Sequence, residues 1–206
     1  MRIFYFLLIC LVFAIGSCDN ENNSASPTKN EMATNEGDND IAKEKSIEEI
    51  AAEICSYLAD EEFISIANYT DENQKIIFSP YLFIDKQNNQ RLTIKEFQAL
   101  FDSQEKVSWG VWDGKGGEIN VPAHEYYHRF ILRGDYCKEG ELHKNELKVK
   151  GNALNNINEV FPNSTYISFY LPPHENDLAE MSWKTLVLVF DNNNYLVGIL
   201  NHEWTI

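Results

Sequence analysis

The chain has 206 residues and a formal net charge of −15, because 32 acidic residues outnumber 17 basic ones. Its lysines and arginines form no cluster, which excludes the nucleic-acid binding that a basic patch provides, and the acidic balance disfavours adsorption on an anionic membrane surface. The length suits one folded domain.

The first seventeen residues are typical of a secretory signal. Met1-Arg2 forms a basic start, residues 3–15 are an apolar run, and the small residues Gly16 and Ser17 follow. The run is shorter than the ~20 apolar residues that a permanent transmembrane helix needs. We therefore expect residues 1–17 to direct export and then to be removed.

The tetrapeptide Ile15-Gly16-Ser17-Cys18 resembles the lipobox of bacterial lipoproteins. The resemblance implies that the Cys18 thiol takes a diacylglycerol and becomes the mature N-terminus, where acyl chains such as palmitate hold the protein in the membrane. The expected location is the exported face of the cell envelope, either periplasm or cell surface. In the alternative interpretation, the signal is an ordinary one and Cys18 is incidental.

Residues 18–45 are predicted to be a disordered acidic tether after the lipidated cysteine. From Asp19 to Lys45 there are seven acidic and three basic residues, and the few apolar residues follow neither a helical nor a strand period. Such a segment buries too little apolar surface to offset the entropy of ordering. The folded domain is then expected over residues 46–206.

Two cysteines remain in that domain, Cys55 and Cys137. Disulfides persist in exported proteins, so an even pair favours a bridge between them. The alternative is that Cys55 is a small buried hydrophobic residue on its helix. The sequence leaves both interpretations open.

Helical patterns open the domain. Ser46-Ile47-Glu48-Glu49 is a capping box and begins an apolar stripe at helical spacing. A short second helix is predicted from Asp60, and Thr93-Ile94-Lys95-Glu96 is the capping box of a further helix. Residues 121–132 are predicted to form another helix.

Strand patterns dominate the rest of the domain. Residues 76–84 are rich in β-branched and aromatic residues, although Pro80 restricts that strand to an edge or a bulge. Residues 107–112 form a strand before a glycine-rich turn, and strands at 166–171, 184–190 and 195–204 close the chain. This order predicts an α+β fold, with paired N-terminal helices packed on a mostly antiparallel sheet.

The domain also carries several short aromatic and turn motifs. They are Phe78-Ser79-Pro80-Tyr81, Ser108-Trp109-Gly110, Asp113-Gly114, Gly151-Asn152-Ala153-Leu154-Asn155-Asn156, Tyr195-Leu196-Val197-Gly198-Ile199 and Trp204-Thr205-Ile206. Together they resemble a group of uncharacterised bacterial envelope lipoproteins. The layout of helices first and a strand hairpin last is similar to NTF2-like domains, which implies a curved sheet wrapped around a conical pocket. Neither resemblance implies catalytic residues.

His124-Glu125-Tyr126-Tyr127-His128 spells the H-E-x-x-H motif of zinc hydrolases. On a helix, the two histidines could bind Zn²⁺ and the glutamate could act as general base, with Glu139, Glu141 or His143 as conceivable third ligands. Pro122 and Arg129 depart from the zincin pattern. The helical wheel instead places the histidines on the flank of an apolar face and Glu125 toward solvent. That face consists of Ala123, Tyr126, Tyr127, Phe130 and Ile131.

Other residues offer weaker hypotheses. Asp113 in the glycine turn could act as a general base at a pocket mouth, although Asp before Gly is also what a tight turn favours. His202 and Glu203 alternate on the last strand and therefore point to opposite faces. Aromatic side chains are expected mainly in the core and alternatively as the floor of a pocket; they are Tyr81, Trp109, Trp112, Tyr170 and Trp204.

These observations predict a lipid-anchored, non-enzymatic binding or accessory module of the bacterial envelope. It needs no cofactor, metal or catalytic residue, and its partners are the membrane, through the lipid, and a small ligand or an envelope protein. The alternatives are a zinc-dependent hydrolase built on His124 and His128, and an NTF2-like pocket enzyme using a carboxylate such as Asp113.

Overall fold

The computed structural model describes residues 45–148, 154–173 and 182–203. The predicted signal (1–17), the lipidation site Cys18 and the predicted tether up to residue 44 lie outside the described residues. The described residues all belong to one compact unit, Lys43–Ile206.

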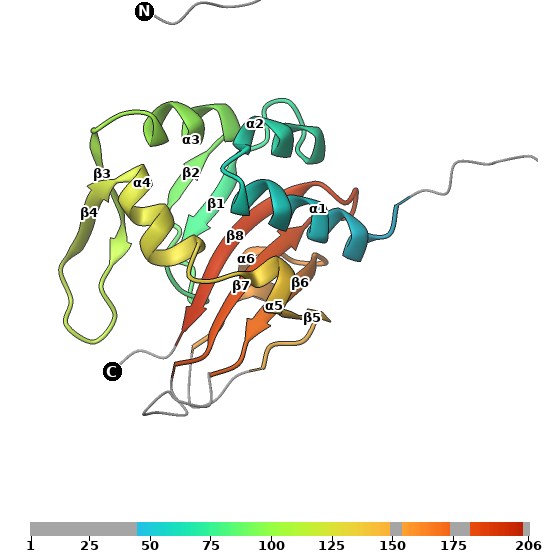
Figure 1. Cartoon of the computed structure of the whole chain (residues 1–206). Coiled ribbons are helices and arrows are strands. Elements are labelled where there is room, and N and C mark those ends of the chain that lie inside the picture. The colour runs from blue at the N-terminus through green and yellow to red at the C-terminus, as the bar shows by residue number, and fades with distance from the viewer. Residues whose placement is uncertain (1–44, 149–153, 174–181, 204–206) are drawn as a thin grey trace, which may run out of the picture. The chain divides into compact units, whose positions relative to one another are not determined.

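A six-stranded sheet forms the centre of the domain (Figure 1). In the order in which they lie side by side, its strands are β2 (Gln90–Leu92), β1 (Ile76–Ser79), β8 (Leu196–Glu203), β7 (Lys184–Phe190), β6 (Thr165–Leu171) and β5 (Glu141–Lys144). All neighbours are antiparallel except β1 and β8, which run parallel. The α+β class is therefore correct, and the sheet is mixed because its first and last strands, β1 and β8, run parallel.

A second, two-stranded sheet stands beside the main one (Figure 1). It consists of β3 (Lys106–Val111) and β4 (Glu118–Pro122), joined by the glycine-rich turn that the sequence predicted. Because Pro122 still pairs with Lys106 at the end of β4, the helix predicted over 121–132 begins later. It starts at Ala123, where proline can precede the first turn without losing a hydrogen bond.

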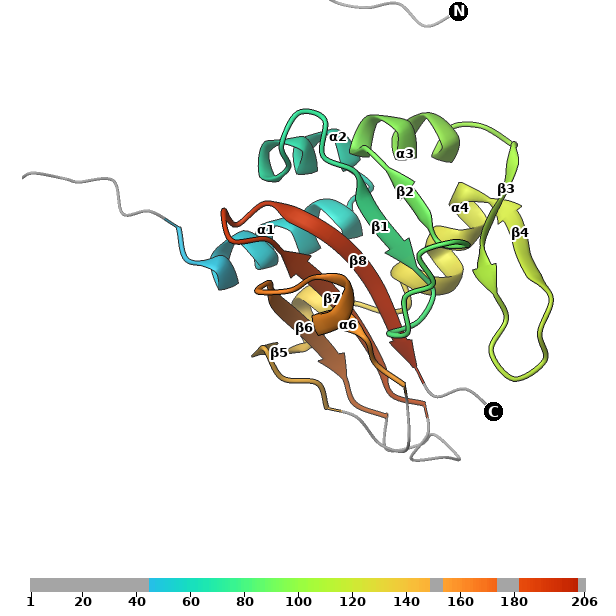
Figure 2. The ribbon, with the colours of Figure 1, turned by 180° about the vertical axis from the view of Figure 1, so that it is seen from behind.

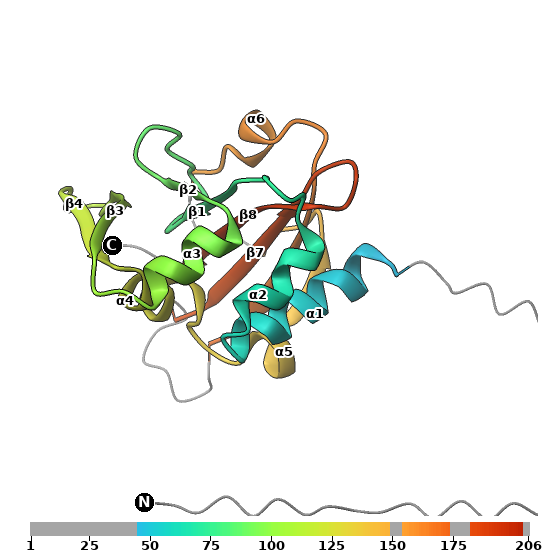
Figure 3. The same ribbon diagram turned by 90° about the horizontal axis from the view of Figure 1, so that it is seen from above.

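Helices cover the two faces of the main sheet unequally, as Figures 2 and 3 show. On one face lie α1 (Ile47–Ala59), α2 (Phe63–Ile66), the 3₁₀ turn η1 (Ala67–Tyr69), α3 (Ile94–Phe101), α4 (Ala123–Tyr126), the π-helical segment η2 (Tyr127–Ile131) and α5 (Tyr136–Glu139). On the other face lies only the single turn α6 (Ile157–Val160), as far as the described residues go. None of the described helices is both long and apolar enough to cross a membrane.

Both predicted capping boxes are present. The Ser46 hydroxyl accepts a hydrogen bond from the Glu49 amide, and the Glu49 carboxylate accepts one from the Ser46 amide. Thr93 and Glu96 make the same reciprocal pair at the start of α3. Each box satisfies donors that a helix end leaves unpaired, so these two helices begin where the sequence predicted.

The layer between the helices and the sheet is an aromatic core. Phe78 on β1 stacks on Phe97 of α3 with ring centroids 4.5 Å apart, and Trp109 on β3 stacks on Tyr126 of α4 at 4.0 Å. Phe63 of α2 meets Phe97 edge to face. These rings bury the largest apolar areas of the domain and fix the helices on that face.

A disulfide joins Cys55 of α1 to Cys137 of α5, with Cα atoms 5.9 Å apart. Of the two interpretations that the sequence left open, the structure has the bridge. It closes a loop of 82 residues, which in the chain-entropy view destabilises the unfolded state by about 4 kcal/mol.

Candidate functional site

An open cleft lies on the face of the sheet that carries only α6 among the described helices. Its volume is about 560 Å³, within the range of small-molecule sites. It is lined from the segment before β1, from β1, β2 and the loop between them, from β8 and the β7–β8 turn, and from α6 and the residues after it. The described residues that line it are Gln74, Lys75, Ile77, Lys86, Arg91, Val160, Phe161, Pro162, Ser164, Asp191, Asn192 and Val197.

The register of the strands builds the floor of this cleft. Arg91 of β2 pairs with Ile77 of β1, Ile77 pairs with Gly198 of β8, and Gly198 pairs with Val189 of β7. Residues that pair directly across a sheet point to the same face. These four residues therefore form one row on the same face of the sheet. The row begins with the Arg91 cation on the edge strand β2 and continues to the apolar side chains of Ile77 and Val189.

Gly198 leaves a gap in that row, and the ring of Phe161 occupies it. A β-carbon at position 198 would come within 3.1 Å of Phe161 Cζ and 3.2 Å of Val189 Cβ. The glycine thus lets the ring lie directly against the backbone of β8. Phe161 becomes part of the cleft wall for this reason, although it comes from outside the sheet.

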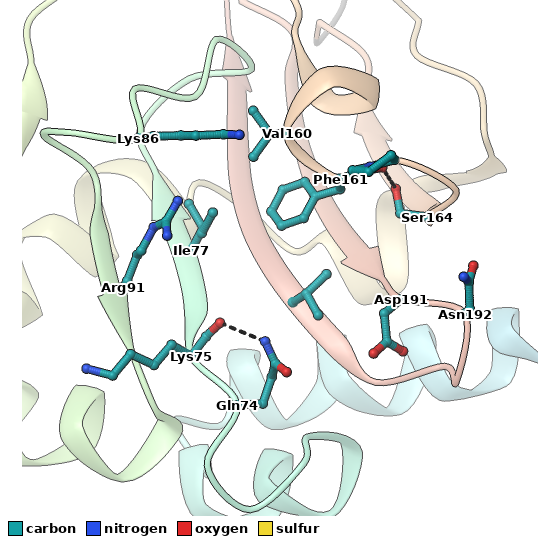
Figure 4. Close-up of a pocket in the computed structure, with 12 residues that line it drawn as sticks. Gln74, Lys75, Ile77, Lys86, Arg91, Val160, Phe161, Ser164, Asp191 and Asn192 are labelled. Carbon is teal, nitrogen blue, oxygen red and sulfur yellow. Dashed lines mark hydrogen bonds between the residues drawn. The ribbon is translucent and has the colours of Figure 1, made fainter.

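Three cationic side chains lie along one side of the floor (Figure 4). Lys75 is 3.7 Å from a Glu96 carboxylate oxygen, whereas Lys86 and Arg91 make no ion pair with another described residue. Figure 4 shows Lys86 extending toward Val160 and the Arg91 guanidinium group beside Ile77, while the Lys75 ammonium group points away from Phe161. The cleft accordingly combines an apolar floor with two cations that no described carboxylate neutralises.

The carboxylate and the hydroxyl among the described lining residues are committed to local structure. The Asp191 carboxylate accepts hydrogen bonds from the amides of Asn193 and Tyr195 in the β7–β8 turn. The Ser164 hydroxyl donates to the Phe161 carbonyl oxygen at 2.8 Å. Among the described lining residues there is no histidine, cysteine or glutamate.

Carboxylates near the rim are stabilised in their charged form. The pKa of Glu96 lies below its usual value, chiefly because its carboxylate accepts the Thr93 amide hydrogen bond, with a smaller contribution from Lys75. The pKa of Asp85, next to Lys86 in the chain, is lowered by hydrogen bonds from Asn88 and Gln87. These hydrogen bonds stabilise the start of α3 at Glu96 and the β1–β2 loop at Asp85.

The H-E-x-x-H segment does not form a metal centre among the described residues. Its predicted apolar face is buried as expected. The two histidines, however, belong to different helical segments: His124 lies in α4 and His128 lies in the π-helical η2. His128 is half-exposed and lies 3.5 Å from a Glu61 carboxylate oxygen. Nowhere in the described part of the chain do three His, Cys, Asp or Glu side chains gather as zinc ligation requires.

The conceivable third ligands lie elsewhere. Glu141 and His143 are on β5, the edge strand of the main sheet, and their side chains are 3.4 Å apart. Glu139 ends α5. None of them joins His124 and His128 in a group of three or more ligand-type side chains within the described residues.

The remaining candidates occupy three different environments. Asp113 lies in the exposed β3–β4 turn, where its carboxylate accepts the Gly114 amide, and it does not line the cleft. Glu203 pairs with Arg129 at 3.5 Å and Arg133 at 3.3 Å. His202 is buried on the opposite face, and burial lowers its pKa to about 4.

The predicted aromatic residues do not line the cleft. Trp109 and Tyr170 are buried, Tyr81 and Trp112 are half-buried, and Trp204 lies outside the described residues. Tyr81 packs against Phe130 and accepts the Asp113 amide hydrogen bond, which fastens the β3–β4 turn. The four described aromatics therefore build core and turn contacts.

Sequence reasoning missed the cleft residues. Arg91, Ile77 and Gly198 are brought together by strand pairing alone, including the parallel ladder of β1 and β8. Nothing in their local spacing indicates that they meet. The one local signal was Gly198 inside a strand pattern, since such a glycine often marks a close approach by another part of the chain.

A second hollow of about 340 Å³ lies at the other end of the sheet, lined from residues 133–139, 171–173 and 182–184. Its lining residues flank positions 174–181, which are outside the described residues. The cleft beside α6 is therefore the better-defined site. No protein-family model, no curated protein and no solved structure matches the chain.

Proposed function

We propose that the protein is an exported, lipid-anchored binding module, and that the cleft beside α6 is its ligand site. The proposal of an anchor rests on the lipobox-like Ile15-Gly16-Ser17-Cys18 and on the acidic segment that follows it. The cell envelope is the corresponding location, with the domain presented on the exported side.

One observation carries the binding function: the cleft has the size and apolar floor of a ligand site but lacks paired catalytic groups. Its only described carboxylate, Asp191, holds a turn, and its only described hydroxyl, Ser164, donates to a backbone carbonyl. A site of this kind favours retention of a ligand over its chemical conversion. The zinc hydrolase and the Asp113 enzyme have no comparable observation in their favour.

The experiment is a fluorescence titration with N-phenyl-1-naphthylamine, an uncharged dye that brightens in apolar surroundings. The protein is the chain from Asp19 to Ile206, which retains the whole described domain. We expect saturable binding that Phe161→Ala weakens about tenfold, because the ring supplies an apolar wall of the cleft.

The matched control is Leu154→Ala. Leu154 is also apolar and is 72% exposed, but it does not line the cleft. Equal losses in the two variants, or no saturable binding at all, would show that the cleft is not the ligand site. Thermal unfolding of each variant separates a lost contact from a lost fold.

We also propose that the domain has an NTF2-like layout. The support is the order of elements, with α1 and α2 at the start of the domain and the β7–β8 hairpin at its end. The parallel ladder of β1 and β8 is a departure that this resemblance did not imply. An experimental structure superposed on known NTF2-like domains tests the proposal.

A further inference from the structure

The floor and rim of the cleft differ in chemistry in a way that selects a class of ligand. Ile77 and Val197 are buried in the apolar cluster of this face, and Val160 and Phe161 pack against it. A ligand lying on them must therefore present an apolar body. The rim immediately beside this floor carries the Arg91 and Lys86 side chains.

The charge of Arg91 is not used elsewhere in the described structure. Of the three described arginines, Arg129 and Arg133 both pair with Glu203, whereas Arg91 has no carboxylate partner among the described residues. A guanidinium group binds carboxylate and phosphate oxygens two at a time. Its position across the ladder from Ile77 places it at the boundary between the floor and solvent.

Lys86 adds a second positive charge to the same boundary. It projects from the β1–β2 loop toward Val160, on the side of the cleft where Arg91 also lies (Figure 4). Like Arg91, it makes no ion pair with another described residue. Two such charges form a local positive region on a chain whose net charge is −15.

We infer that the cleft binds a small amphipathic anion, whose apolar body lies on Ile77, Val197 and Phe161 and whose phosphate or carboxylate group is held by Arg91 and Lys86. This inference rests on the proposed binding function and names its ligand class. An inorganic anion gains nothing from the apolar floor. The apolar body therefore supplies the basic affinity, and the anionic group adds to it through Arg91 and Lys86.

The test compares two dyes that differ by one anionic group. 1-Anilinonaphthalene-8-sulfonate carries a sulfonate, which stands in for the phosphate or carboxylate, and N-phenyl-1-naphthylamine lacks it. For the double variant Lys86→Gln/Arg91→Gln we expect about tenfold weaker binding of the sulfonate dye. Binding of the uncharged dye should stay within about twofold of wild type, because the floor is unchanged.

Lys95→Gln is the matched control. Lys95 is exposed on α3, makes no ion pair with another described residue and does not line the cleft. It removes one surface charge from the same domain and should leave both affinities unchanged. Binding of the sulfonate dye to wild type should also weaken as salt is raised, while that of the uncharged dye should not.

Competition then identifies the anionic group. Octyl phosphate and octanoate should each displace the sulfonate dye, and the more effective of the two shows whether phosphate or carboxylate is preferred. Inorganic phosphate and octanol should be poor competitors.

The results distinguish a failure of the anion inference from a failure of the proposed binding function. If the uncharged dye binds in the cleft but the double variant and Lys95→Gln bind the sulfonate dye equally well, the anion inference is wrong and the binding function stands. Octanol competing as well as the two anions would overturn the anion inference in the same way. If neither dye responds to Phe161→Ala, the proposed function fails as well.

Discussion

At the scale of single residues, the least expected feature is a buried imidazole. His202 of β8 pairs across the ladder with Thr185 of β7, and its ring lies 4.5 Å from that of Trp183. Its Nε2 atom is buried without a hydrogen-bond partner among the described residues. Burial in these surroundings disfavours the charged ring, which is why the pKa of His202 falls to about 4.

This depressed pKa makes stability depend on pH. An unfolded histidine has a pKa of about 6.5, so between pH 6.5 and pH 4 the unfolded chain binds a proton that the folded one does not. Stability is therefore present above pH 6.5 and is lost as the pH falls toward 4. We expect the free energy of unfolding to drop by about 2 kcal/mol between pH 7 and pH 5 from this residue alone.

Denaturant unfolding at several pH values checks the expectation. His202→Phe removes the titrating ring and should flatten this part of the profile. Thr185→Val changes the cross-strand neighbour without removing the imidazole, and should keep the wild-type slope. Parallel profiles for wild type and His202→Phe would contradict the assignment.

At the scale of elements, side-chain hydrogen bonds join the two-stranded sheet of β3 and β4 to β2 of the main sheet, because no backbone ladder pairs β2 with β3. The Asn89 side-chain amide donates to the Trp109 carbonyl oxygen at 3.0 Å, and that of Gln90 donates to the Ser108 carbonyl oxygen at 2.6 Å. Gly110 permits this approach, because its φ is 137° and a β-carbon would lie 2.8 Å from Asn89 Nδ2. The edge of β3 that faces β2 is thus capped, which protects it from pairing with other chains.

Two adjacent buried tyrosines at the junction of α4 and η2, Tyr126 and Tyr127, differ in their hydrogen bonding. Tyr127 donates a hydrogen bond to the Leu58 carbonyl oxygen at the end of α1, whereas the buried Tyr126 hydroxyl has no partner among the described residues. We expect Tyr127→Phe to lower the free energy of unfolding by about 1 kcal/mol. Tyr126→Phe should be neutral or stabilising, because it removes a buried polar atom that nothing described satisfies.

Denaturant unfolding of the two single variants is the measurement. Both substitutions remove one oxygen from a fully buried ring on adjacent positions, so each serves as the control for the other. A larger loss for Tyr126→Phe than for Tyr127→Phe would contradict these hydrogen-bond assignments.

At the scale of the whole molecule, the two faces of the main sheet differ in how they are covered. One face is filled by the aromatic core under the helices, and the disulfide of Cys55 and Cys137 fastens the helical layer. The other face has a smaller apolar cluster, which the described residues cover only in part, through α6 and its flanking turns. The uncovered part of that face is the cleft.

The proposed membrane attachment is tested on the whole chain. We expect Cys18→Ser to leave the domain folded but without lipid, because the thiol that would take the diacylglycerol is gone. Fractionation after labelling with radioactive palmitate is the measurement, and Cys10→Ser is the matched control. Label retained by Cys18→Ser, or lost in Cys10→Ser, would contradict lipidation at Cys18.

Much of the helical layer could be predicted from local patterns. Capping boxes at Ser46 and Thr93 act within four residues, and the apolar face from Ala123 to Ile131 follows from side-chain spacing. Three strands were missed, β2, β4 and β5, since each has at most five residues and mixes polar with apolar side chains. The parallel pairing of β1 and β8 joins residues more than a hundred positions apart, and no local pattern encodes it.

The amino-acid sequence by itself determined the α+β class, the starts of α1 and α3, the acidic character and the lipobox-like N-terminus, because these depend on composition and on neighbours a few residues apart. Only the tertiary structure decided where the cleft lies, which cations rim it and which histidine is buried. Those features depend on strand register, which sets residues from distant segments side by side on one face of the sheet.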